Sequence, residues 1–467
     1  MAVATDLPAD IWEEIIAFLP ITTLACVCLI SKAFNVPGTR VLYRSIDLNT
    51  LHQTIGCLKT LKGNELAGRS TRNLWMNYKV ELYPEGSVVM QGFFGLIAKA
   101  LKRLPNLRTL EIRVVHREYP HLSEWFDYIF DDCTFPHLTM LLLYMPITPN
   151  LVSFLGRHQS TIRTLFLIPL TNYNTYRVAG NSWLFPSLTW LHVADTVAPN
   201  FLSSSTLPAV ERFETTCSFE VPGVSVQELI KSIKKSCKEH TLMQLNFNRN
   251  GWNVELIEEI AANSVSSTIL SVHCIWFNQL TEGDISLHQE RLEKVQISLS
   301  KLPALRSFYW TVETKFGEHP PPQWNVDEEI DIILRFGKVC PSLNRCQLPH
   351  GLIWTRFVND LWMPADDSAR EFKVSRWLFT KLHARHYPAD ELLYLMDAYA
   401  SLHSFVRDVI ERFRDADNKL KSEIEEDKDD CKARTFDLMA VGMVLGFWYS
   451  SSFKRNPAYR KFRNMYP

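Results

Sequence analysis

The sequence has almost no net charge, no leader-like start and no cysteine spacing typical of a metal site. Its formal net charge is −1 over 467 residues, so no overall field favours nucleic acid or an anionic membrane. The first residues lack a basic region followed by an apolar stretch, and we therefore expect no signal peptide. The composition, 46% hydrophobic and 22% charged, is that of a globular protein with room for more than one domain.

The ten cysteines are scattered along the chain. Cys26 with Cys28 and Cys340 with Cys346 are the close pairs, and neither has a second pair at the spacing of a zinc site. Many of the cysteines lie in apolar contexts, where a free thiol behaves as a small buried hydrophobe. We therefore expect no bound metal and a reduced, intracellular chain in the cytoplasm, the nucleus or both.

Motifs for catalysis are missing as well. The chain has no glycine-rich phosphate loop, no G-x-S-x-G and no H-E-x-x-H. His383 and His386 are three residues apart without a nearby carboxylate or cysteine, and we interpret them as surface residues. We expect no catalytic residue, no cofactor and no enzymatic activity; an enzyme hidden in the C-terminal hundred residues is the weaker alternative.

One apolar stretch, residues 436–453, is shorter than the roughly twenty residues that a membrane span needs, and it contains Asp437 and two glycines. We interpret it as a helix packed against the protein and expect no membrane contact. The preceding residues 411–434 are rich in charge and are interpreted as a solvated helix end or linker.

The N-terminal stretch is organised as short helices with much apolar surface. Leu7-Pro8 opens a helix with Ile11, Ile15 and Leu19 on one face, and Pro20 ends it. Thr22 or Thr23 is expected to cap a second helix with Leu24, Val27 and Ile30 in its core, and Pro37-Gly38 is expected to break the chain. So small a block leaves apolar surface uncovered, which marks a partner site unless the rest of the chain covers it.

These residues resemble an F-box. The similarity runs through Leu7-Pro8, Ile11, Ile15, Leu19, Leu24, Ile30, Ser31, Lys32 and Phe34, with isoleucine and phenylalanine where many F-boxes carry valine and tryptophan. The segment Leu42–Ile46 is similar to the one that follows the F-box in many fungal members. The resemblance implies docking on the Skp adaptor of a cullin-based SCF ubiquitin ligase, through Leu7, Pro8, Ile11, Ile15, Leu19, Leu24, Val27, Ile30 and Phe34.

A degenerate repeat follows. The pattern Leu104-Pro-Asn-Leu107-Arg-Thr-Leu110 recurs with its origin near residues 105, 136, 160, 186, 208, 240, 267, 303 and 341, and a further copy is expected at Thr71–Met76. Each unit predicts a turn, then a short strand with alternate residues buried, then a returning helix. We expect Leu110, Leu141, Leu165, Leu191 and Leu245 to form one buried column.

The units resemble leucine-rich repeats, although the asparagine that regularises their turns is present in one of nine copies. The predicted fold is therefore α/β: a three-helix F-box over residues 1–45, an irregular leucine-rich-repeat solenoid with a parallel sheet and outer helices over 46–351, and a C-terminal cap over 352–467. In the cap, residues 352–363 predict a hairpin that closes the edge of the sheet, and residues 389–414 predict a helix.

Two functions from different classes fit this organisation. The first is a substrate receptor of an SCF-type ligase, which needs no catalytic residue because it raises the effective concentration of a substrate. The second is a repeat scaffold whose N-terminal helices pack internally. For the first, a protein substrate is expected on strand residues that face away from the buried column: Leu142, Tyr144, Phe166 and Trp190, with His192, Arg212 and Glu214 beside them. A loop or the C-terminal helices covering these residues is the alternative.

Overall fold

The computed structural model describes residues 8–79, 87–115, 129–131, 133–145, 147–168, 183–216, 225–237, 242–263, 265, 267–276, 288–314, 326–349, 352–356, 361–364, 410–411, 414–415 and 418. The chain divides into two compact units. The first comprises Met1–Leu305 with Val312–Glu318, and the second comprises Arg306–Thr311 with His319–Pro467. The described elements form a mixed α/β protein with a large, mostly parallel sheet.

Three helices open the first unit: α1 (Ala9–Ile16), α2 (Ile21–Ile30) and α3 (Lys32–Leu42). Pro8 precedes α1 as its N-cap residue, and Pro20 does the same for α2, so neither Thr22 nor Thr23 caps the second helix as we expected. Proline serves here because its fixed φ and missing N–H suit a helix start. Ser31 caps α3, and its hydroxyl accepts a hydrogen bond from the backbone N–H of Ala33 at 3.1 Å.

The prediction of a break at Pro37-Gly38 is wrong, because α3 continues through both residues. Pro37, Gly38 and Thr39 are buried in the helix bundle, and this packing offsets the hydrogen bond that the proline removes. Gly38 allows a close approach, since a Cβ at this position would lie 2.6 Å from Sγ of Cys28 on α2. Tertiary packing therefore overrides the local breaker signal.

Strands and helices alternate through the rest of the first unit. The strands of its main sheet are β1 (Ser45–Leu48), β2 (Asn73–Lys79), β3 (Thr109–Val115), β4 (Met140–Tyr144), β5 (Thr164–Leu167), β7 (Trp190–Ala194), β9 (Arg212–Thr216), β10 (Gln244–Asn250) and β11 (Ile269–Trp276). The helices are α4 (Leu51–Gly63), α5 (Glu65–Ser70), α6 (Ser87–Leu101), α8 (Pro149–His158), α9 (Ala198–Ser203), α10 (Val226–Ser236), α11 (Val254–Ala262) and α13 (His288–Leu299). A small parallel pair, β6 (Trp183–Leu184) and β8 (Ser205–Thr206), lies apart from the main sheet.

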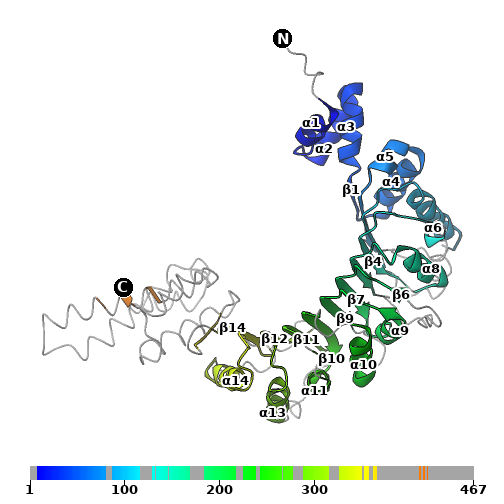
Figure 1. Cartoon of the computed structure of the whole chain (residues 1–467). Coiled ribbons are helices and arrows are strands. Elements are labelled where there is room, and N and C mark those ends of the chain that lie inside the picture. Colours follow the sequence, from blue (N-terminus) through cyan, green and yellow to red (C-terminus); the bar gives the residue numbers. More distant parts are fainter. Residues whose placement is uncertain are drawn as a thin grey trace. The chain divides into compact units, whose positions relative to one another are not determined.

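The strands of the main sheet pair in parallel and in the predicted register. Leu110 pairs with Leu141, Leu141 with Leu165, and Leu165 with Leu191. These four residues and Leu245 are all 0% exposed, so the predicted leucine column is confirmed. The helices α6, α8, α9, α10 and α11 lie on one side of this sheet (Figure 1). Among the described residues from β2 to β11, no helix covers its other side, which we call the open face.

The second unit contains residues 307–311 of β12 (Ser307–Thr314), together with α14 (Val326–Val339), β13 (Arg345–Gln347), β14 (Ile353–Arg356) and β15 (Trp362–Pro364). Strand β12 pairs in parallel with β13, whereas β14 pairs antiparallel with both β13 and β15. The predicted closing hairpin is therefore present. A carboxylate anchors it: Oε1 of the buried Glu329 accepts hydrogen bonds from the N–H of Leu352 at 2.5 Å and from the indole of Trp354 at 2.9 Å.

Several predictions fall outside the described residues or stay untested. Residues 357–360 of the predicted hairpin, most of the helix at 389–414, most of the charged segment 411–434 and the apolar segment 436–453 are not described. Leu7 and the histidines at 383 and 386 are likewise outside. The domain boundaries at residues 45 and 351 and the assignment as leucine-rich repeats stay predictions.

Candidate functional site

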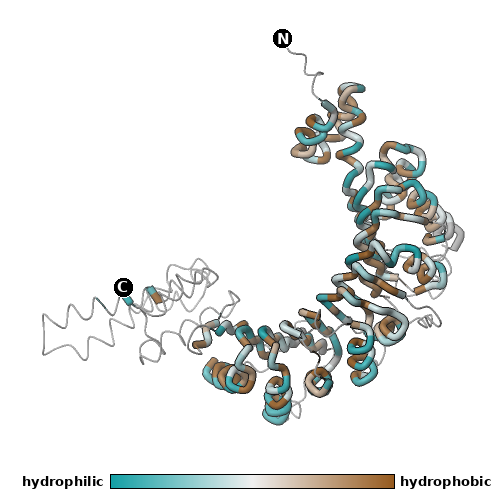
Figure 2. Tube along the Cα trace, viewed as in Figure 1, coloured by the Kyte–Doolittle hydropathy of each residue, from teal (hydrophilic) through white to brown (hydrophobic). Residues whose placement is uncertain are grey.

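The three N-terminal helices leave large apolar side chains in contact with solvent. Ile11 is 38% exposed, Ile15 46% and Ile30 73%. Four neighbours are also exposed: Phe18 at 89%, Ile21 at 65%, Leu29 at 86% and Val36 at 42%. Figure 2 shows brown, apolar stretches along these helices. An apolar surface of this kind marks an interaction site, and we call Ile11, Ile15, Phe18, Ile21, Leu29 and Ile30 the apolar face.

Most of the other described docking residues lie deeper than these isoleucines. Leu24 is 4% exposed and belongs to the core of the bundle, so it does not lie on the apolar face. A helix of ten almost wholly apolar residues offers no polar side to show which residues turn inward. Leu19, Val27 and Phe34 are partly buried, and the ring of Phe34 packs edge-on against Trp12 with centroids 4.8 Å apart. Pro8 is exposed.

Glu13 fixes the bundle to the start of the sheet. Its carboxylate pairs with Arg40 on α3 at 2.8 Å and with Arg44, just before β1, at 3.4 Å. The glutamate side chain is only 17% exposed, so these ion pairs are better shielded from solvent than an ordinary surface pair. The apolar face is thus presented by a bundle that is tied to the following strand.

A second cluster lies on the open face of the sheet. The ring of Phe166 packs edge-on against Trp190 and His192, with centroids 4.8 and 5.0 Å apart. Phe166 is only 7% exposed, whereas Leu142, Tyr144, Trp190 and His192 are partly exposed. The contact surface that we expected from Phe166 is therefore nearly absent, because its neighbours on the same face enclose the ring.

Arginines cover the exposed aromatic rings of this cluster. The guanidinium carbon of Arg212 lies 4.0 Å from the centroid of Trp190, and that of Arg113 lies 4.0 Å from the centroid of Tyr144. Both are cation–π distances. The surface that a partner meets is therefore mixed, with guanidinium groups over aromatic rings, and it is not a bare aromatic patch.

Polar groups continue the cluster onto β9. Glu214 pairs with Arg212 at 3.2 Å, and Nδ1 of His192 lies 3.8 Å from the same carboxylate. Burial lowers the pKa of His192; Glu214 opposes this shift and Arg212 adds to it. We call Leu142, Tyr144, Phe166, Trp190, His192, Arg212 and Glu214 the open-face patch. Its residues are brought together on four strands, as the repeat register predicts.

Within the described ranges, no group of three histidine, cysteine, aspartate or glutamate side chains is placed to hold a metal ion. In the same ranges, no helix is long and apolar enough to cross a membrane.

The N-terminal helices match a known family. Residues 5–36 fit the family model of the F-box domain. The chain contains an F-box domain. F-box domains bind Skp-type adaptors, and the domain points to a role as the substrate adaptor of an SCF-type ligase in general. A comparison with curated proteins gives no match.

The apolar face includes three residues that the sequence pattern did not single out. Phe18 follows α1 by two residues, Ile21 begins α2, and Leu29 stands next to the predicted Ile30. The helical spacing of Ile11 and Ile15 continues to Phe18, three residues after Ile15. The pattern could therefore have predicted that Phe18 lies on the same side. Ile21 and Leu29 lie on an α2 that is apolar all round, where the sequence gives no such signal.

Proposed function

We propose that this F-box protein is the substrate-recognition subunit of an SCF-type ubiquitin ligase, which docks the Skp adaptor through its apolar face and holds a protein substrate on the open-face patch. The observation that supports docking is the exposure of Ile11, Ile15 and Ile30 within the F-box. A scaffold with internally packed N-terminal helices, the alternative, would bury these side chains under the repeats.

The proposal needs no catalytic residue in this chain. A receptor accelerates ubiquitin transfer by holding a substrate lysine near the charged conjugating enzyme. We propose accordingly that the protein is not an enzyme, and that its strand–helix units are degenerate leucine-rich repeats. The described cysteines form no disulfide with one another, in keeping with the proposed location in the cytoplasm or nucleus.

Adaptor docking is tested by charging the apolar face. The variant Ile15→Asp/Ile30→Asp changes two side chains that solvent already reaches, so the chain should still fold. Burying one such side chain in an interface contributes about 1.5–3 kcal/mol, and the variant should bind the purified Skp adaptor at least 100-fold more weakly by calorimetry. Leu184→Asp, at a residue 51% exposed on β6, is the matched control.

Three outcomes are informative. Loss of adaptor binding in Ile15→Asp/Ile30→Asp, with binding retained in Leu184→Asp and unchanged circular dichroism in both, supports docking through the apolar face. Unchanged affinity in the double variant contradicts it. Unfolding of the double variant but not of Leu184→Asp favours the internal packing of the scaffold alternative.

The open-face patch is tested separately. Tyr144→Ala and Trp190→Ala remove partly exposed rings, whereas Phe166→Ala would mainly open a cavity under them. The double variant Tyr144→Ala/Trp190→Ala should keep adaptor affinity and lose the ubiquitinated proteins that the wild-type protein accumulates in cells when the proteasome is inhibited. Tyr309→Ala, at a partly exposed position of β12, serves as the control. An unchanged set of ubiquitinated proteins in the patch variant would place the substrate elsewhere.

A further inference from the structure

Three arginines occupy equivalent positions in successive strand units. Arg44, Arg72 and Arg108 each stand directly before a strand, namely β1, β2 and β3. The carbonyl of Arg44 accepts a hydrogen bond from the N–H of Arg72 at 3.0 Å, and the carbonyl of Arg72 accepts one from the N–H of Arg108 at 2.7 Å. The three residues therefore form a row along one end of the sheet, with a step of about 4.8 Å set by strand spacing.

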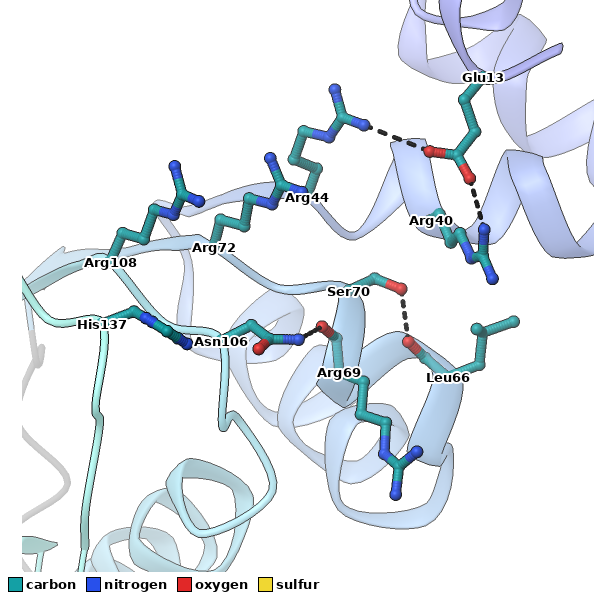
Figure 3. Close-up of a pocket in the computed structure, with 10 residues that line it drawn as sticks. All are labelled: Glu13, Arg40, Arg44, Leu66, Arg69, Ser70, Arg72, Asn106, Arg108 and His137. Carbon is teal, nitrogen blue, oxygen red and sulfur yellow. Dashed lines mark hydrogen bonds and ion pairs between the residues drawn. The ribbon is translucent and has the colours of Figure 1, made fainter. Parts of the chain in front are cut away.

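The row lines a cavity of about 490 Å³ beside the F-box. Arg40 and Glu13 contribute from the F-box helices, and Arg69 contributes from α5. Figure 3 shows the side chains of Arg44, Arg72 and Arg108 extending in the same direction. We call this cavity, with its five arginines and Glu13, the arginine pocket.

The acids near the arginine pocket leave much of its charge unbalanced. Glu13 forms ion pairs with both Arg40 and Arg44, and Arg69 pairs with Glu65 on its own helix at 2.6 Å. Arg72 and Arg108 are exposed, and no carboxylate of the described residues lies within ion-pair distance of either. Like charges held side by side repel one another, so a bound anion would stabilise the arrangement.

We propose that the arginine pocket binds a compact anion that carries two or more phosphate groups. The planar guanidinium donates paired hydrogen bonds to phosphate oxygens, and several such groups lie together here. The cavity volume falls within the range of small-molecule sites, about 300–1,000 Å³. An extended acidic peptide fits the row less well, because its side chains on one face recur every two residues, at about 6.7 Å rather than about 4.8 Å.

A bound polyphosphate would contact both the F-box helices and the first strands. Arg40 lies on α3, whereas Arg72 and Arg108 belong to the repeat units. The anion would therefore act as a bridge that holds the F-box against the repeats, and its binding should raise the melting temperature of the chain. This inference does not rest on adaptor docking or substrate capture, since the arginine pocket lies within the chain itself.

The test is calorimetric titration of the full chain with tripolyphosphate, at constant ionic strength and without adaptor. Arg72→Gln/Arg108→Gln removes the two arginines that have no acid partner among the described residues, so it should fold. Arg163→Gln is the matched control: Arg163 precedes β5 at the equivalent position, is exposed, and does not line the arginine pocket. Orthophosphate and a peptide with one phosphoserine are titrated in parallel.

We expect one tripolyphosphate per chain, bound at least tenfold more weakly by Arg72→Gln/Arg108→Gln and equally well by Arg163→Gln, with orthophosphate weaker than tripolyphosphate. The absence of binding to the wild-type chain would overturn the proposal. Equal weakening by Arg163→Gln would also overturn it, because that result indicates attraction to surface charge in general. Tighter binding of the phosphopeptide than of tripolyphosphate would overturn the choice of a compact polyphosphate in favour of a phosphorylated protein segment.

Discussion

His158 should make the stability of this protein depend on pH. It ends α8, is buried, and its Nε2 accepts a hydrogen bond from the backbone N–H of Phe135 at 3.1 Å. Only a neutral imidazole has a nitrogen that accepts. Burial, with a smaller effect of Arg157, lowers the pKa of His158 from 6.5 to about 4. Protonation therefore opposes the folded state.

The direction and size of the effect follow from this pKa. Because the folded pKa lies below the unfolded value, the unfolded chain binds the proton first between about pH 6.5 and pH 4, and stability falls as the pH falls through that range. One pKa unit corresponds to about 1.4 kcal/mol. Lowering the pH from about 7.5 to about 5 should therefore remove about 2 kcal/mol from the free energy of unfolding.

Urea unfolding at the two pH values, followed by circular dichroism, measures this loss. The variant His158→Gln offers an amide oxygen as acceptor and does not titrate. On acidification, this variant should therefore lose about 2 kcal/mol less stability than the wild type. His137→Gln, which changes an exposed histidine, controls for the loss of any imidazole. If His158→Gln loses as much stability at low pH as the wild type, the assignment of His158 as the titrating group is wrong.

Two further predictions concern the packing of the repeats and the closing hairpin. Leu191→Ala, at a position 0% exposed, should cost about 2–5 kcal/mol in urea unfolding, whereas Leu184→Ala, 51% exposed, should stay within about 0.5 kcal/mol; equal costs would contradict the register. Glu329→Leu should remove the carboxylate that accepts from the N–H of Leu352 and from the indole of Trp354, at a cost of about 1–3 kcal/mol for each hydrogen bond lost. The amide of Leu352 should then exchange hydrogen much faster, and unchanged protection would show that the carboxylate does not hold the hairpin.

The periodic part of the fold was readable from the sequence, and the helix packing was not. Alternating burial around Leu110, Leu141 and Leu165 is a local signal, so strand positions and the buried column followed directly. The course of α3 through Pro37-Gly38 depends on a contact with Cys28 on α2, which no local pattern contains. The short strand β1 was likewise missed, because it is defined by its pairing with β2.

The two candidate surfaces, likewise, could be predicted only in part from the sequence. Periodicity placed Phe166 on the open face, but its enclosure by Trp190 and His192 depends on the neighbouring strand β7. The apolar face was predicted from α1, where polar residues separate it from the rest of the helix surface, and was incomplete on α2, which has no polar side. The row of Arg44, Arg72 and Arg108 becomes visible in the sequence only once the first residue of each strand is known.

The short connection between the F-box and the sheet determines how a captured substrate would be presented. Only Tyr43 and Arg44 separate α3 from β1, and Arg44 is itself held by Glu13 of α1. A flexible linker would let a bound substrate occupy many positions, so its effective concentration at any one of them would be low. With so short a connection, a lysine on the substrate would reach the conjugating enzyme from a narrow range of directions. Under the proposed function, such a receptor would select which lysine is modified as well as which protein is captured.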